Sequence, residues 1–343
     1  MAGSGSAEVR TPIFSGENYE FWRIKMKGIT TPDSKKKKVK TDEKSDSDGD
    51  DDEKMAAIFM KDAKALGIIQ NAISDQIFPR IANADSAKSK SVATPLVSSD
   101  KLGKNDGSGP ASEEQYRRIV GSLLYLTATR PDIMYVASLL ARFMHCPTNK
   151  HLGTAKRVLR YIKGTLDYGL EYVKGKKSML IGFCDSDWGG SIDDSKSTSG
   201  YAFSFGSGVF SWASVKQNCV ALSTVEVEYI SASEATAQAI WLRFVLADFG
   251  ELQAEATPMY CDNTAAIAIT KNPVFHQKTK HIDRRYHFIK DALQEGVIDL
   301  LYCPTNEQVA DIFTKALTKD RFNYLRDLLG VKSAQNLKGS VEL

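Results

Sequence analysis

Acidic side chains stand beside apolar segments at four places in the second half of the sequence. Asp185 and Asp262 each follow a short apolar run that is typical of a buried strand, and Asp311 lies at the start of a late helical pattern. Glu226 and Glu228 lie near the start of a long helical pattern. Taken singly, such residues are usually exposed groups of ordinary turns and helix ends. If they converge on one point, their hard oxygen ligands would suit Mg²⁺, which binds through a few carboxylates and keeps several waters.

Hydrolysis of a phosphodiester is the chemistry that such a cluster can support. The reaction needs an activated water, a stabilised leaving oxygen and relief of the negative charge at phosphorus. Two Mg²⁺ ions roughly 3.5–4 Å apart supply all three. They need a compact cage of carboxylates, and the crowding of like charges would disfavour that cage without metal.

Six ordered segments surround these residues, and together they indicate a family. The segments are 183–190, 196–201, 222–229, 261–266, 279–283 with 286–289, and 307–315. In sequence and in order they resemble the ribonuclease H domain of copia-type retrotransposon Pol polyproteins. The resemblance is nearly continuous over 178–316, and it implies a ribonuclease H-like fold.

The resemblance also implies a ligand set. Asp185, Glu228, Asp262 and Asp311 are expected to form the cage, to hold two Mg²⁺ ions and to be the catalytic carboxylates. Glu226 stays open as an alternative to Glu228, although the residues after Glu228 match the family better.

Further residues near the cage are candidates for supporting roles. His281 is expected either to move a proton and help product to leave, as a histidine near its ordinary pKa can, or to hold a surface turn. Asp187 is expected to be a neighbour of the cage rather than a ligand. The 2′-hydroxyl, which separates RNA from DNA, would be read by Ser186, Asn263 and Thr264. The residues expected to bind nucleic acid are Ser186, Asn263, Thr264, Lys278, Lys280 and Arg284.

The elements that must position these residues follow from the apolar pattern. Strands are predicted at 179–184, 200–205, 209–212, 257–261 and 297–303, and helices at 224–249, 263–271, 283–294 and 307–316. Three strands followed by alternating helices and strands predict an α/β protein with a mixed five-stranded sheet and flanking helices. This order is that of a ribonuclease H-like fold. The tail from Ser333 onward is expected to be loose.

A helical unit is predicted at 112–175, before the first strand. Ser112 and Thr148 are suited to cap its first and third helices, Pro131 to begin the second, and Gly164 to end the third. The third helix has a basic face, typical either of phosphate contact or of a solvated surface, formed by Lys150, Lys156, Arg157, Arg160 and Lys163. The unit resembles the segment that joins polymerase to ribonuclease H in copia-type elements. The sequence has no Tyr-x-Asp-Asp polymerase motif and no visible protease or integrase motif.

The rest of the chain consists of charged or polar stretches and of segments that resemble pieces of copia-type gag proteins. Blocks of like charge bury little apolar surface, so they predict disorder. In chain order the predicted domains are a gag-like fragment (1–30), a charged disordered linker (31–54), a gag-like helical fragment (55–83), a linker (84–111), the helical polymerase-tail unit (112–175), the ribonuclease H-like domain (176–320) and a C-terminal helix or tail (321–343).

Composition bounds the partners and the compartment. The 343 residues carry a net charge of +3, which is too small by itself to indicate a nucleic-acid partner. Five cysteines without metal-binding spacing fit a reducing compartment, and the chain is expected in the cytoplasm or the nucleus. The sequence has no apolar N-terminal signal region and no run long enough to span a bilayer, so no membrane partner is expected.

The hypothesis from the sequence is a retrotransposon-derived ribonuclease H that cuts the RNA strand of RNA–DNA hybrids with two Mg²⁺ ions. Reverse transcriptase or gag products of related elements are its other expected partners. Two alternatives stay open. In one, the chain is a catalytically inactive relic that binds nucleic acid. In the other, it self-associates through its gag-like part.

Overall fold

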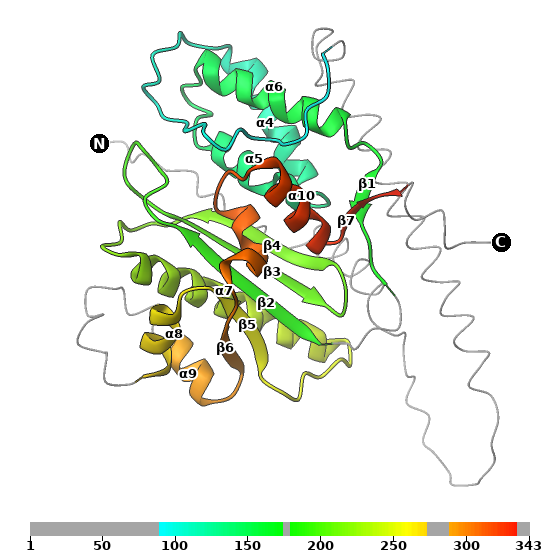
Figure 1. Ribbon diagram of the computed structural model, residues 1–343, viewed down its shortest axis with the longest axis vertical. Helices are drawn as coiled ribbons and strands as arrows, with labels where there is room; N and C mark the ends of the chain where they lie inside the picture. The colour runs from blue at the N-terminus through cyan, green and yellow to red at the C-terminus, as the bar shows by residue number, and fades with distance from the viewer. Residues whose placement is uncertain (1–88, 174–178, 273–287, 335–343) are drawn as a thin grey trace, which may run out of the picture. The chain divides into compact units, whose positions relative to one another are not determined.

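The structure, a computed structural model, describes residues 89–173, 179–272 and 288–334 (Figure 1). The chain divides into two compact units, 1–73 and 74–343, and every described residue belongs to the second. The gag-like fragments and the charged linker predicted before residue 84 lie outside the described residues. No helix in the described part of the chain has the length and apolar character that crossing a membrane requires.

A five-stranded mixed sheet forms the centre of the described structure, with strand order β4-β3-β2-β5-β6 (Figure 1). β2 (Leu180–Asp187) pairs antiparallel with β3 (Thr198–Phe205), which pairs antiparallel with β4 (Val209–Lys216). On its other side β2 pairs in parallel with β5 (Thr257–Cys261), and β5 pairs in parallel with β6 (Ile298–Tyr302). Helices flank this sheet, so the predicted ribonuclease H-like α/β fold is confirmed.

The three antiparallel strands extend further than the apolar pattern predicts. The pattern ends β2 at Cys184, but the strand continues to Asp187. Asp185 pairs with Gly200 in β3, and Asp187 pairs with Thr198. The ladder continues through these polar residues because its hydrogen bonds join backbone groups, whatever the side chain. Asp185 therefore lies inside the central strand and not in a turn after it.

Helix α7 (Thr224–Asp248) covers one face of the sheet, with α8 (Thr264–Lys271) and α9 (Phe288–Gln294) beside it (Figure 1). The N-cap of α7 is Ser223, whose side chain accepts a backbone hydrogen bond from the first turn at 3.2 Å. The helices predicted at these three places are confirmed within the described residues. The start of the helix predicted at 283–294 lies outside them.

The other face carries the C-terminal elements, and here the prediction is wrong in part. The helix predicted at 307–316 is instead two 3₁₀ turns, η4 (Thr305–Glu307) and η5 (Val309–Phe313). Gln308 separates them because its backbone is extended, with φ −69° and ψ 102°. Its side chain accepts a hydrogen bond from the Ala310 N–H at 3.2 Å and so starts η5 in a new direction.

In the described part of the chain, three α-helices and a 3₁₀ turn precede the sheet: α4 (Glu113–Leu126), η1 (Pro131–Ile133), α5 (Met134–Ala141) and α6 (Asn149–Lys163). Ser112 caps α4, Thr148 caps α6, and Gly164 follows the last residue of α6, as predicted. Pro131 begins η1, a tighter turn than the predicted α-helical start, and α5 continues from it.

A buried ion pair ties these helices to the C-terminal helix α10 (Lys319–Leu328). Arg130 donates to both carboxylate oxygens of Asp132, at 2.9 and 2.7 Å. Tyr161 donates to the same carboxylate at 2.6 Å, and Arg326 of α10 donates to the Tyr161 hydroxyl at 3.5 Å. Residue 320, the predicted end of the ribonuclease H-like domain, lies in α10, and α10 contacts the helical unit predicted at 112–175.

The sequence pattern does not predict a second, two-stranded sheet. In it β1 (Tyr168–Leu170) pairs antiparallel with β7 (Val331–Ser333). The tail that was expected to be loose from Ser333 is therefore paired up to that residue. Strands of three residues are too short to show a clear period.

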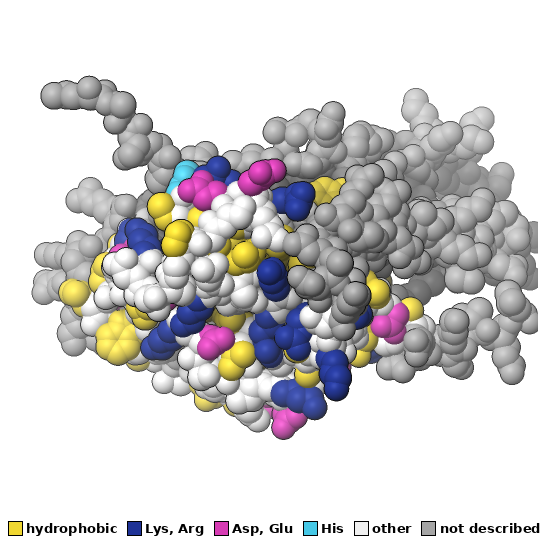
Figure 2. Space-filling model, turned by 90° about the horizontal axis from the view of Figure 1, so that it is seen from above, with side chains coloured by type: hydrophobic (Ala, Val, Ile, Leu, Met, Phe, Trp, Pro, Cys, Tyr) yellow, Lys and Arg dark blue, Asp and Glu magenta, His cyan; other side chains and the backbone are white. Residues whose placement is uncertain are grey.

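The basic face of α6 has protein partners in this structure. Arg160 Nε donates to the Lys90 carbonyl at 2.8 Å, and Arg157 donates to the Thr94 hydroxyl at 3.1 Å. The described part of the predicted linker, 89–111, thus contacts α6 rather than running free. Figure 2 is seen from above the view of Figure 1, in which α6 lies at the top, and shows Lys and Arg side chains (dark blue) gathered on this face.

Candidate metal centre

Four carboxylates gather at the C-terminal ends of β2 and β5. Asp185 lies on β2, and Asp262 directly follows β5, the parallel neighbour of β2. Glu228 comes from the start of α7 on one face of the sheet, and Asp311 comes from η5 on the other. The structure therefore brings together the four side chains that the sequence analysis placed in one cage.

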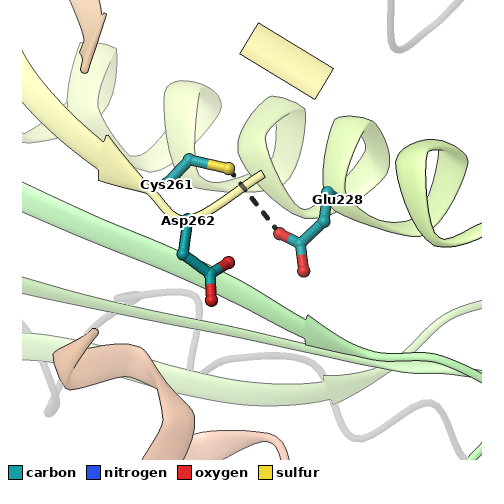
Figure 3. Close-up of side chains that lie close together, drawn as sticks. All are labelled: Glu228, Cys261 and Asp262. Carbon is teal, nitrogen blue, oxygen red and sulfur yellow. Dashed lines mark hydrogen bonds between the residues drawn. The ribbon is translucent and has the colours of Figure 1, made fainter. Parts of the chain in front are cut away.

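The ligand atoms of this cluster form two triplets that share Asp262. Oxygens of Asp185, Asp262 and Asp311 lie within 4.8 Å of one another. Ligand atoms of Glu228, Cys261 and Asp262 form the second triplet, also within 4.8 Å (Figure 3). Because Asp262 belongs to both triplets, the cluster can offer oxygens to two neighbouring cations.

Glu228 is held in the cluster by Ser186. Glu228 Oε1 accepts hydrogen bonds from the Ser186 backbone N–H at 3.1 Å and from its hydroxyl at 2.8 Å. Its Oε2 faces the Cys261 thiol, 3.8 Å away (Figure 3). Glu226 instead accepts a hydrogen bond from the Leu222 N–H at 2.8 Å and so closes the start of α7. The geometry thus places Glu228, and not Glu226, beside the other carboxylates.

Asp185 is almost fully buried, with 2% of its surface exposed. Its Oδ2 accepts a hydrogen bond from the Thr314 hydroxyl, and the Lys315 ammonium lies 3.8 Å from the same oxygen. Burial raises the pKa of Asp185 from its ordinary value of 3.8 to about 7, Lys315 opposes the rise, and Asp311 adds to it. A cation bound beside this carboxylate would therefore offset an unfavourable negative charge.

Asp311 is paired with two basic side chains. Lys315 Nζ lies 2.8 Å from Asp311 Oδ1, and Arg321 Nη2 lies 3.2 Å from Oδ2. Arg321 also donates to the carbonyls of Thr305, at 2.6 Å, and Gln308, at 3.3 Å. Arg321 therefore fastens the η4–η5 segment that carries Asp311, a role that sequence reasoning missed.

Two residues let η5 approach the sheet closely. Gln308 is fully buried, and its Nε2 donates to the Cys184 carbonyl of β2 at 3.0 Å. Gly200 lies beneath η5, where an added Cβ would stand 2.7 Å from the Phe313 Cβ. Both residues lie inside segments that resemble the family, Gly200 in 196–201 and Gln308 in 307–315. That resemblance could have marked them as functional, but the sequence analysis assigned neither a role.

The donor set fits a divalent cation. Burial raises the pKa of Glu228, and the Asp185 carboxylate adds to the rise. These crowded carboxylates are hard oxygen ligands, which suit Mg²⁺. The Cys261 thiol, whose pKa is lowered by a hydrogen bond with Cys184, adds a softer donor to the second triplet.

The residues predicted to contact nucleic acid are only partly within the described chain. The Ser186 hydroxyl donates a hydrogen bond to Glu228. Asn263 caps α8 by accepting a hydrogen bond from the Ala266 N–H at 3.0 Å, and Thr264 is exposed in the first turn of that helix. Their contact with RNA stays a prediction. Four further predicted residues lie outside the described residues: His281, Lys278, Lys280 and Arg284.

Comparison with known proteins gives relatives over most of the chain. No protein-family model matches it. The chain is 39% identical over 251 residues to the retrovirus-related Pol polyprotein from transposon RE2 of Arabidopsis thaliana, covering 73% of this chain and 17% of that polyprotein. It is 36% identical over 286 residues to the corresponding polyprotein from transposon TNT 1-94 of Nicotiana tabacum, covering 81% of this chain and 21% of that polyprotein. The chain thus spans about a fifth of the length of these curated relatives.

Among solved structures the chain is similar to LC11-RNase H1, which was isolated from compost by a metagenomic approach. The two share 12% sequence identity with a TM-score of 0.28, over 40% of this chain and 93% of that chain.

Proposed function

Because the chain belongs to the family of retrovirus-related Pol polyproteins of copia-type transposons, we propose that its ribonuclease H-like domain hydrolyses the RNA strand of RNA–DNA hybrids. The observation that carries the proposal is the gathering of Asp185, Glu228, Asp262 and Asp311 in one cluster. Buried like charges destabilise a fold unless cations offset them. A cation-dependent reaction accounts for the cluster.

The proposed cations are two Mg²⁺ ions, one at each triplet. When bound, such ions activate a water and offset the negative charge at phosphorus. The chain's own part is to hold the ligands in place: Ser186 orients Glu228 with two hydrogen bonds, and Thr314 orients Asp185. Arg321 holds the segment that carries the fourth carboxylate.

The substrate assignment rests on the family and on the position of α8. Asn263 and Thr264 follow Asp262 directly, so they are proposed to read the 2′-hydroxyl of the RNA strand next to the cage. Phosphates of the hybrid are proposed to contact Lys278, Lys280 and Arg284, and His281 is proposed to help product leave. Reverse transcriptase and gag products of related elements are the proposed protein partners.

The test is cleavage of a labelled RNA–DNA hybrid by the purified chain with Mg²⁺. Single-stranded RNA, duplex RNA and duplex DNA are the comparison substrates. We expect cleavage of the RNA strand of the hybrid alone, loss of cleavage in chelator, and loss of cleavage in the variant Asp185→Asn. Asp299→Asn removes the same charge at an exposed ion pair on β6 and should cleave as the wild type does.

Binding of the hybrid without cleavage, in wild type and Asp185→Asn alike, would refute the enzyme proposal. That result would favour the inactive relic. Cleavage that persists in Asp185→Asn would show that another group carries the reaction, and the assignment of the cage would then be wrong.

A further inference from the structure

The Lys315 side chain lies beside two carboxylates of the cage. Its ammonium lies 2.8 Å from Asp311 Oδ1 and 3.8 Å from Asp185 Oδ2. These two carboxylates are the ones that form the first triplet with Asp262. A cation supplied by the chain itself therefore stands where the ligands of one proposed metal ion meet.

The ammonium keeps its charge in this position. Burial alone lowers the pKa of Lys315, but the surrounding carboxylates, first Asp185 and then Asp311, outweigh burial and raise it overall. A single positive charge facing several carboxylates offsets part of their mutual repulsion. Lys315 is thus a counter-ion for the cluster as the structure presents it.

We propose that Lys315 competes with a divalent cation for Asp185 and Asp311, pairing with them in the metal-free chain and giving up these contacts when the cation binds. The inference rests on the proposed function, since it assumes that the first triplet binds metal. It makes Lys315 a positioning residue: it preserves the cage before metal arrives, and it lowers the apparent affinity for metal.

The displaced Lys315 side chain can move into solvent. The Lys315 side chain is 37% exposed, so its path to solvent is open. It also lines a small pocket together with Leu96, Tyr135 and Ile312. A divalent cation at the triplet would repel the ammonium and at the same time take over its carboxylate partners. Withdrawal of the partly exposed side chain into solvent relieves that repulsion.

The alternative role for such a lysine is contact with a phosphate of the substrate. In that case its removal would weaken substrate binding and leave metal affinity unchanged. Metal affinity measured in the absence of substrate therefore separates the two roles.

The experiment uses the full chain and the variants Lys315→Met, Lys315→Arg and Lys319→Met. Met keeps the length of the side chain and removes its charge, Arg restores the charge, and Lys319 is an exposed control on α10. Binding of Mn²⁺ is followed by the electron paramagnetic resonance signal of the free ion, and thermal melting is followed in chelator and in rising Mn²⁺. Both readouts are independent of cleavage. A buffer at about pH 8.5 keeps proton competition at the raised pKa of Asp185 small.

We expect Lys315→Met to bind Mn²⁺ about tenfold more tightly than wild type, because the competing ammonium is gone. Without metal it should melt at a lower temperature, since the repulsion between the carboxylates is no longer offset. Lys315→Arg should resemble the wild type in both measurements, and Lys319→Met should match it.

Equal or weaker Mn²⁺ binding by Lys315→Met than by wild type would overturn the inference and leave the proposed function standing. Absence of Mn²⁺ binding in wild type and in every variant would overturn the proposed function and this inference together. If Lys315→Met unfolds in chelator, Mn²⁺ binding by Lys315→Gln, titrated under the same conditions, decides the outcome in the same way.

Discussion

Replacing Asp185 by Asn should make the metal-free protein more stable while it removes the proposed activity. The carboxylate is almost fully buried, and burial raises its pKa from 3.8 to about 7. A group whose pKa is raised on folding holds its proton more tightly in the folded chain than in the unfolded chain. Stability therefore falls as pH rises between these two values, because unfolding releases a proton that the folded chain still holds.

The size of the effect follows from the two pKa values. Asn resembles the protonated carboxylic acid at every pH, so the variant escapes the cost of ionisation. The gain in unfolding free energy should be below about 1 kcal/mol at about pH 4 and should reach roughly 4 kcal/mol at about pH 8. Thr314 can still donate its hydroxyl hydrogen to the Asn oxygen, and Lys315 keeps its contact with Asp311.

The assay is urea denaturation of wild type and Asp185→Asn in chelator across this pH range. Asp299→Asn is the matched control, because it removes one carboxylate from an exposed ion pair with Lys271 and should change stability by less than about 1 kcal/mol. Saturating Mg²⁺ should reverse the order by stabilising the wild type alone. If Asp185→Asn is no more stable than wild type at the alkaline end, the ionised carboxylate carries no penalty and the reasoning is wrong.

Two further predictions test how the cage is held. Glu228→Gln should reduce the rise in melting temperature on adding Mg²⁺, because the second triplet loses a ligand while the first stays intact. Glu226→Ala should keep the full rise and cost about 1 kcal/mol through loss of the cap to Leu222; the opposite pattern would exchange their roles. Gln308→Ala should cost roughly 1–3 kcal/mol in urea unfolding, because it leaves the buried Cys184 carbonyl without its donor. It should also weaken Mg²⁺ binding, measured by calorimetry, and unchanged binding would show that Asp311 does not depend on this contact.

Local pattern was enough to locate the strands and helices that carry the carboxylates. Apolar runs before Asp185 and Asp262 predicted two strands of the sheet, and the capping residues Ser112 and Thr148 predicted helix starts that the structure has. These features could be predicted because each depends on residues within a few positions of one another. The same dependence explains why β2 was ended too early at Cys184: its last residues are held by pairing with a partner strand rather than by apolar character.

Contacts between distant segments could not be predicted in this way. The helical pattern at 307–316 is compatible with an α-helix, but Gln308 reaches the Cys184 carbonyl and the chain breaks into two 3₁₀ turns. The basic face of α6 left phosphate contact and solvation equally open, and the structure shows it donating to 89–101 instead. Each outcome depends on what packs against the element, which its own residues do not specify.

The sequence by itself determined the family, the order of the five strands of the main sheet and of α7, α8 and α9, and the identity of four acidic residues near those elements. Only the tertiary structure decided that Glu228 rather than Glu226 joins the other three, that Asp262 serves both triplets, and that Lys315 stands among their oxygens. The physical reason is that residue types and spacing are local properties of the chain. Distances between side chains on β2, α7, β5 and η5 arise only when the helices and the sheet pack together.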